Sequence, residues 1–234
     1  MSDNVLATLA EQTGLSILDE IANPYEDTLA EFSKGTWLPR LQLEGSNSNL
    51  VKDDKIEKGS FALHYGKDKF VGLGKTVDIF LITHRPKAID LTDPAKPRAS
   101  YNVQSDLFKE IVELAKSKDK ETKKNKMYGA EFLIYLPDGP EDKRYCTLHM
   151  GNPTARQETA NFRPLLKKSA TLTVQKIKAN GYTWEGIQIL PLTRDIVISD
   201  TDLLERTVRN FYNPPVDTTD TKQSEESPME TARG

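Results

Sequence analysis

The chain has 234 residues, and its 32 lysines and arginines nearly balance 35 aspartates and glutamates, for a formal net charge of −3. This total excludes a uniformly basic nucleic-acid coat protein and a highly charged disordered protein. No run approaches the roughly 18 consecutive apolar residues of a membrane span, and the acidic N-terminus does not match a signal peptide. The single cysteine, Cys146, cannot form an internal disulfide, so we expect a soluble cytoplasmic protein.

The charge is distributed unevenly along the chain. Residues 1–34 carry seven acids and one lysine, a net charge of −6, and residues 201–234 carry −3, whereas residues 35–200 carry +6. Apolar residues recur at helical spacing near the N-terminus, and few are present after residue 213. We therefore predict an amphipathic acidic helical arm at 1–34, a β-rich core domain at 35–212 and a disordered acidic tail at 213–234.

Within the core domain, hydrophobic periodicity changes from helix to strand and back. Alternating or continuous apolar residues predict strands at 38–43, 61–65, 77–83, 132–136 and 145–150. Ser105 is a suitable N-cap for a helix at 106–118, and a second helix is predicted at 202–211. Residues 153–168 predict a broken helix because Pro164 must interrupt it. The clearest element is a hairpin of strands 170–178 and 182–190, joined by a type I′ turn at Asn180-Gly181.

These elements predict an α+β protein that is mainly β. Six or seven strands with two intervening helices fit an antiparallel, partly open barrel of the oligonucleotide-binding (OB) type, or a curled antiparallel sheet with helices at its ends.

The sequence contains no catalytic motif. Gly74-Lys75-Thr76 lacks the upstream glycine of a phosphate loop and precedes a strand rather than a helix. The three histidines lie far apart and have no cysteine partners at zinc spacing, and Cys146 is expected to be a buried hydrophobic residue. We therefore expect a protein that is not an enzyme and that needs neither a cofactor nor a metal.

The hairpin carries the main functional signal. Strand alternation places Ile187 and Ile189 on one face and Tyr182 and Trp184 on the other. Because the isoleucines require the core, the two aromatic rings are expected on the opposite face; the alternative is that they pack beneath a helix. Flat rings beside lysines are typical of a groove for single-stranded nucleic acid, in which bases stack and cations neutralise phosphates.

Nine residues form the candidate nucleic-acid-binding set on this interpretation. The stacking candidates are Tyr182, Trp184, Tyr135 and Tyr145, and the phosphate-contacting candidates are Lys176, Lys178, Lys143, Arg144 and Arg40. The lysine-rich segment at 116–126 is either a solvated surface or a further phosphate contact, and the sequence leaves this open.

Residues 130–234 resemble phage single-stranded-DNA-binding proteins of the OB-fold type, as found in T7-like phages. The resemblance rests on the strand at 168–175, on the Asn180-Gly181 turn with Tyr182 and Trp184, and on the acidic segment after Pro215. It implies sequence-tolerant binding of single-stranded DNA, with RNA as the alternative ligand, in phage DNA replication or recombination in the host cytoplasm. It also implies that the tail contacts other replication or recombination proteins.

Two alternatives remain open. The protein could be a phage structural or assembly protein whose N-terminal arm packs against a partner or forms a homo-oligomer. It could also be an enzyme whose site is assembled from distant strands.

Overall fold

Nine strands form one mixed sheet in the computed structural model, which describes residues 38–66, 69–93, 97–179 and 181–213. The order is β3-β2-β1-β7-β6-β4-β8-β9, and β5 pairs with β4 off this path. The strands are β1 (Arg40–Glu44), β2 (Ser60–Gly66), β3 (Lys69–Gly74), β4 (Thr76–Asp90), β5 (Arg98–Ser100), β6 (Lys126–Tyr135), β7 (Tyr145–Met150), β8 (Lys168–Ala179) and β9 (Tyr182–Pro191).

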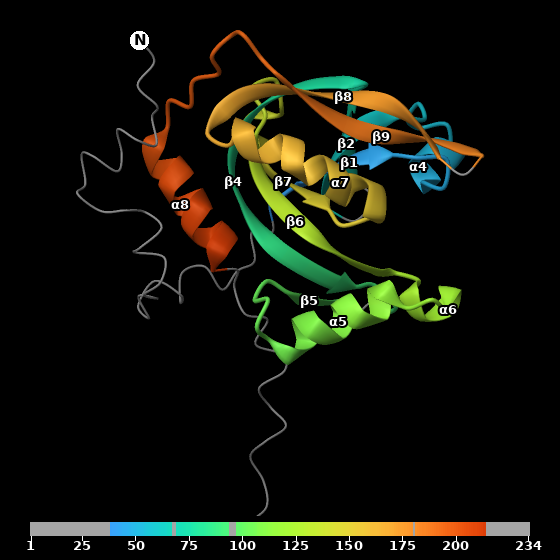
Figure 1. Ribbon diagram of the computed structural model, residues 1–234. Coiled ribbons are helices and arrows are strands. Elements are labelled where there is room, and N and C mark those ends of the chain that lie inside the picture. Colours follow the sequence, from blue (N-terminus) through green and yellow to red (C-terminus); the bar gives the residue numbers. More distant parts are fainter. Residues whose placement is uncertain (1–37, 67–68, 94–96, 180, 214–234) are drawn as a thin grey trace, which may run out of the picture.

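Five α-helices accompany the sheet within the described residues. They are α4 (Asn49–Lys52), α5 (Asp106–Lys116), α6 (Lys120–Lys123), α7 (Pro153–Phe162) and α8 (Thr201–Tyr212). The sheet curls around α7, while α5 and α6 lie at the far end of β4 and β6, and α8 stands against the opposite side (Figure 1). The protein is therefore α+β and mainly β, as predicted. None of the described helices is long and apolar enough to cross a membrane.

The sheet differs from the expected one in two ways. It is mixed rather than wholly antiparallel, because β1 runs parallel to β7. It also has more strands than the predicted six or seven: the sequence did not indicate β3 or β5. The sheet is not closed, since its edge strands β3 and β9 do not pair with each other in the described residues.

The longest strand, β4, connects the two halves of the sheet. Its first residues, Thr76–Leu81, pair with β8, and Phe80–Asp90 pair with β6. The sequence predicts a strand at 77–83 only, but β4 continues through Pro86 to Asp90. At Pro86, β4 has a strand partner on one side only, β6, and proline is tolerated at such an edge position.

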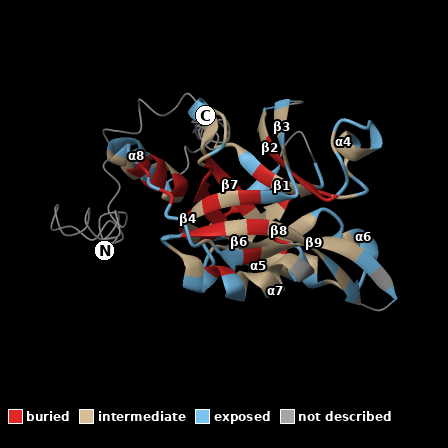
Figure 2. Ribbon diagram, turned by 90° about the horizontal axis from the view of Figure 1, so that it is seen from above, coloured by how far each residue is buried: buried red, intermediate tan, exposed pale blue. Residues whose placement is uncertain are grey.

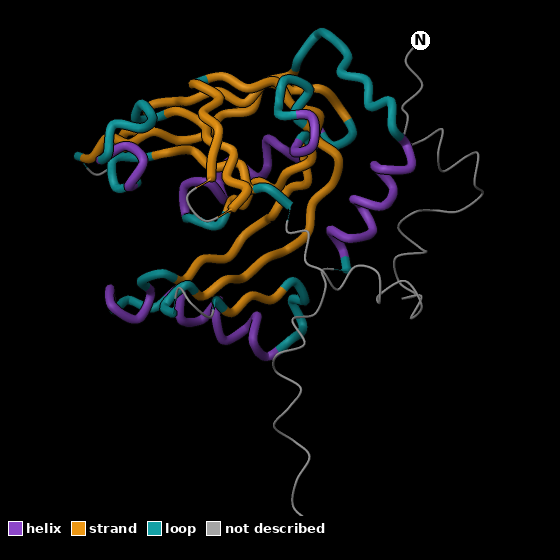
Figure 3. The backbone as a smooth tube through the Cα atoms, turned by 180° about the vertical axis from the view of Figure 1, so that it is seen from behind, coloured by secondary structure: helices purple, strands orange, loops and turns teal. Residues whose placement is uncertain are grey.

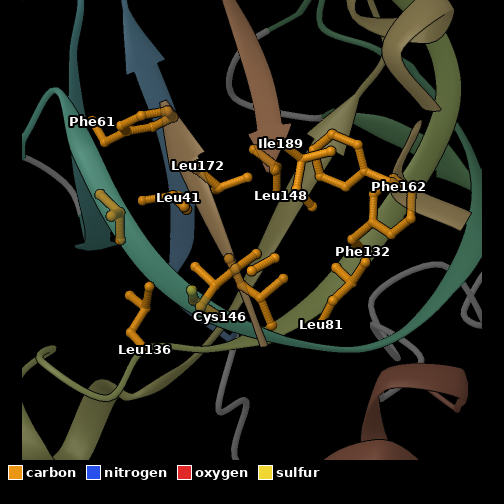
Figure 4. Packing of buried hydrophobic residues seen from close by; sticks show 14 of the residues in the cluster. Leu41, Phe61, Leu81, Phe132, Leu136, Cys146, Leu148, Phe162, Leu172 and Ile189 are labelled. Atoms are coloured by element: carbon orange, nitrogen blue, oxygen red, sulfur yellow. The ribbon is translucent and has the colours of Figure 1, made fainter. Parts of the chain in front are cut away.

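The concave face of the sheet holds the main core. Buried side chains from seven strands pack together there with Phe162 of α7, whose ring centroid lies 4.8 Å from that of Phe132 (Figure 4). Cys146 belongs to this cluster and is fully buried, as predicted, and burial raises the pKa of its thiol. Viewed from above, buried residues concentrate in the central strands (Figure 2).

A second apolar cluster covers the other face of the sheet. Leu204, Val208 and Phe211 of α8 pack there against side chains of β4, β6 and β7. The Tyr212 hydroxyl is hydrogen-bonded to the Thr83 hydroxyl at 2.6 Å and donates to the His84 carbonyl at 3.1 Å. The central strands are therefore buried on both faces, which fits the near-continuous apolar run of β4.

Most local predictions are confirmed. Ser105 caps α5, with its Oγ accepting a hydrogen bond from the Phe108 N–H at 3.2 Å. α7 ends in a 3-10 turn at Arg163–Leu165, which contains the helix-interrupting proline. The hairpin of β8 and β9 turns at Gly181, whose φ of +77° requires glycine. The predicted arm at 1–34 and the tail from residue 214 lie outside the described residues.

Candidate nucleic-acid interface

A cavity of about 310 Å³ opens where β1 and β7 part. These two strands share only two register pairs, Arg40 with Thr147 and Leu41 with Leu148, and then diverge. The space is bounded by β1, the end of β7, the first turns of α7 and the hairpin of β8 and β9. Segments more than 100 residues apart in the sequence therefore form one site.

Trp184 and Arg40, two of the predicted binding residues, both line this cavity. Trp184 is half-buried on β9, opposite Ile177 of β8. Gly186, on the same strand, lets Ile177 pack close against the backbone, because a Cβ at that position would lie 2.3 Å from Ile177 Cδ1. Arg40 is exposed, and its guanidinium has no ion pair among the described residues. The site therefore offers a flat ring and an available cation.

His149 forms the polar end of the cavity. Its Nε2 atom is buried and has no hydrogen-bond partner among the described residues. Burial, and next the Lys87 ammonium, lower the pKa of the imidazole to about 4, so the ring is neutral at neutral pH. Gly151 makes room for the ring, because a Cβ there would lie 2.4 Å from His149 Cε1. The buried ring therefore contributes an uncharged part of the cavity wall.

Two carboxylates, Glu158 and Glu185, also line the cavity, and both have partners. Glu185 forms a 3.0 Å ion pair with Lys58, and this contact lowers the pKa of its carboxyl. Glu158 accepts a hydrogen bond from the Asn161 amide at 2.8 Å. Lys58 offsets the negative charge of Glu185, whereas the neutral Asn161 amide does not offset that of Glu158.

The lysines predicted on the hairpin are exposed. Lys176 lies opposite Glu185 and Lys178 opposite Thr183 in the β8–β9 ladder, beyond the cavity toward the turn. Tyr182 begins β9, but its side chain lies outside the described residues. By strand alternation both lysines lie on the hairpin face that carries Glu185, which also lines the cavity, and not on the face that carries Trp184.

The prediction that Tyr135 and Tyr145 stand on an open face is wrong. Their exposed fractions are 9% and 8%, and their rings contact each other edge to face at 5.2 Å beneath α8. We had assigned only one face of the sheet to a core, whereas α8 buries the second face as well. A base can stack on neither ring in this arrangement.

Lys143 and Arg144 are not at the cavity. They precede β7, whereas His149 lies near its other end, about 17 Å away along an extended strand. Lys143 pairs with Asp142 and lies 5.0 Å from the Tyr65 ring centroid. Arg144 donates to the Tyr135 hydroxyl at 3.4 Å. Both cations are half-buried and engaged with neighbouring side chains.

Sequence reasoning missed several cavity residues, among them His149, Met127 and Asn152. The histidines lack cysteine partners at zinc spacing, so His149 has no motif that marks it, and the pairing of β1 with β7 has no local signal. Within the described residues no group of histidine, cysteine and carboxylate side chains could hold a metal ion.

Comparison of the chain with models of protein families, with curated proteins and with solved structures finds no match. The interpretation of the cavity therefore rests on its own geometry.

Proposed function

We propose that the protein binds single-stranded DNA with little dependence on sequence. One base would enter the cavity and stack on Trp184, while Arg40, Lys176 and Lys178 contact neighbouring phosphates. The observation that carries the proposal is that Trp184 and Arg40, which are far apart in the sequence, line one cavity of about 310 Å³. This volume falls at the lower end of the range for small-molecule sites and accommodates a base.

The chemistry of the cavity agrees with this assignment. Stacking of a base on an aromatic ring contributes about 1 to 3 kcal/mol and tolerates any base, because every base has a π face. The exposed cations contribute affinity that depends on salt but carries no sequence information.

We further propose that the open, curled sheet serves as an OB fold does, with the ligand at the side where the hairpin lies. A role in phage DNA replication or recombination, with partner proteins contacting the segment after Pro215, rests on the resemblance in arrangement alone.

The test follows Trp184 fluorescence during titration with oligo-dT. The chain has two tryptophans, so Trp37→Phe leaves Trp184 as the only reporter. Binding should quench its emission, and the affinity should fall steeply between about 50 and 200 mM salt. Trp184→Phe should retain part of the affinity and Trp184→Leu should lose about 1 to 3 kcal/mol, both measured by mobility shift because these variants lack the reporter, with circular dichroism confirming the fold of each variant.

A parallel titration with oligo-rU compares RNA with DNA at the same site. Absence of both a fluorescence change and a mobility shift at low salt, with either oligonucleotide, would rule out the proposed function.

A further inference from the structure

A second cationic surface lies on α5, α6 and the residues between them. It consists of Lys116, Lys118, Lys120, Lys123 and Lys124, and we call it the lysine surface. All five side chains are exposed. Lys124 pairs with Glu121 at 3.8 Å, whereas Lys118, Lys120 and Lys123 have no ion pair among the described residues.

The acids within this segment do not neutralise it. Residues 116–126 contain six lysines and only two acids, Asp119 and Glu121. The Asp119 carboxylate caps α6 by accepting a hydrogen bond from the Thr122 N–H at 2.6 Å, and this bond lowers the pKa of the carboxyl. The segment therefore keeps a net charge of +4 near neutral pH.

The lysine surface is connected to the cavity through a stack on Tyr128. The Lys116 ammonium lies 5.6 Å from the Tyr128 ring centroid, and the Arg156 guanidinium of α7 lies 3.9 Å from it. Arg156 also donates to the carbonyls of Tyr128 and Gly151, at 3.1 Å each. Gly151 and the residue before Tyr128, Met127, both line the cavity. Cationic side chains thus extend from the cavity to α5.

The hairpin tip and α6 lie at the same end of the molecule. Both stand at the right in the view from the front and at the left in the view from behind (Figures 1 and 3). α8 lies on the other side of the sheet in both views. The segments that carry the hairpin cations and the lysine surface therefore lie at one end of the molecule.

We infer that the lysine surface is a second phosphate-binding surface, which holds the same single strand where it continues beyond the cavity. This inference rests on the proposed function, since it extends the path of that ligand. A strand long enough to fill the cavity and reach α6 contacts both surfaces, whereas a short oligonucleotide contacts only the first.

The experiment compares Lys120→Gln/Lys123→Gln with the control Arg206→Gln/Arg209→Gln. Both double variants remove two exposed positive charges, the first pair from α6 and the second from α8 on the other side. Each is titrated with oligo-dT of about five and about twenty nucleotides, lengths that bracket the site size of most single OB folds. Trp184 fluorescence in the Trp37→Phe background reports binding to the cavity in every case.

Each lysine against a phosphate should contribute about 0.7 to the slope of log affinity against log salt. Loss of two such contacts should reduce the slope by about 1.4. If the two contacts contribute nothing at 1 M salt, the affinity for the long oligonucleotide at 0.1 M salt should fall by roughly 25-fold. The short oligonucleotide should bind the α6 variant and the control equally well.

The outcomes separate the inference from the proposed function. If the unaltered protein binds both lengths, but the α6 variant loses no more affinity for the long one than the control, the inference is wrong and the proposed function stands. If the unaltered protein binds neither length, both fail.

Discussion

Acidification should weaken the fold through His149, and replacing this residue should remove that effect. The imidazole is buried between β6, β7 and the cavity, and its charged neighbours are Lys87, Glu131 and Arg40. The pKa of the folded state, about 4, lies below the ordinary value of 6.5. The folded protein therefore resists protonation of His149, and the unfolded chain accepts the proton more readily.

The difference between the two pKa values gives the sign and the size of the effect of pH on stability. The stabilisation is fully present above pH 6.5 and is lost as the pH falls from 6.5 toward 4. A difference of about 2.5 pKa units corresponds to roughly 3 kcal/mol when the transition is complete. Of this, about 2 kcal/mol should be lost between pH 7 and pH 5, where most carboxylates are still ionised.

The assay is urea denaturation of the unaltered protein and of His149→Gln at pH 7, 6 and 5. Glutamine cannot be protonated in this range, so the free energy of unfolding of the variant should depend less on pH by about 2 kcal/mol. The absolute stability of the variant can differ for packing reasons, and only the pH dependence is compared. An equal pH dependence in both proteins would refute the placement of a buried, neutral imidazole at this position.

Three further substitutions and one control substitution test the packing of the sheet, each by urea denaturation. Gly129→Ala should cost about 3 kcal/mol or more because its Cβ would lie 2.0 Å from the Met150 carbonyl oxygen, whereas Gly45→Ala, with no atom within 4 Å, should change stability by less than about 0.5 kcal/mol. Glu131→Ala should cost about 3 to 5 kcal/mol because it leaves two largely buried cations unpaired. Gly181→Ala should cost about 1 kcal/mol through its positive φ; an unchanged midpoint would contradict the turn geometry.

The elements that the sequence predicted well have strong local signals. The hairpin has a turn dipeptide between two alternating strands, and its glycine adopts the expected positive φ. The helix α5 has an N-cap serine followed by a periodic apolar face, and Ile111 on that face is fully buried. In both cases neighbouring residues are sufficient to determine the conformation.

The elements that the sequence did not predict depend on partners that are distant along the chain. β5 is only three residues long and exists as a strand because it pairs with the end of β4. β3 contains two glycines and has no strong β propensity, yet it forms because β2 offers it an edge. Tyr135 and Tyr145 were misplaced for a similar reason: the alternation of a strand distinguishes its two faces but does not reveal that a helix near residue 200 covers the second one.

The candidate site shows most clearly what local sequence patterns do not reveal, because it lies where the pairing of β1 with β7 ends. After Leu41, β1 pairs only with β2, and after Leu148, β7 pairs only with β6. The edges that these strands turn toward each other have no strand partner in the described residues beyond this point, and the cavity occupies the resulting space. Arg40, His149 and Trp184 meet there because the sheet divides between β1 and β7, whereas in a continuous sheet the same residues would lie on separate surfaces. The net charge of −3 gives no indication of this arrangement, since the cations that surround the opening belong to the basic middle of the chain.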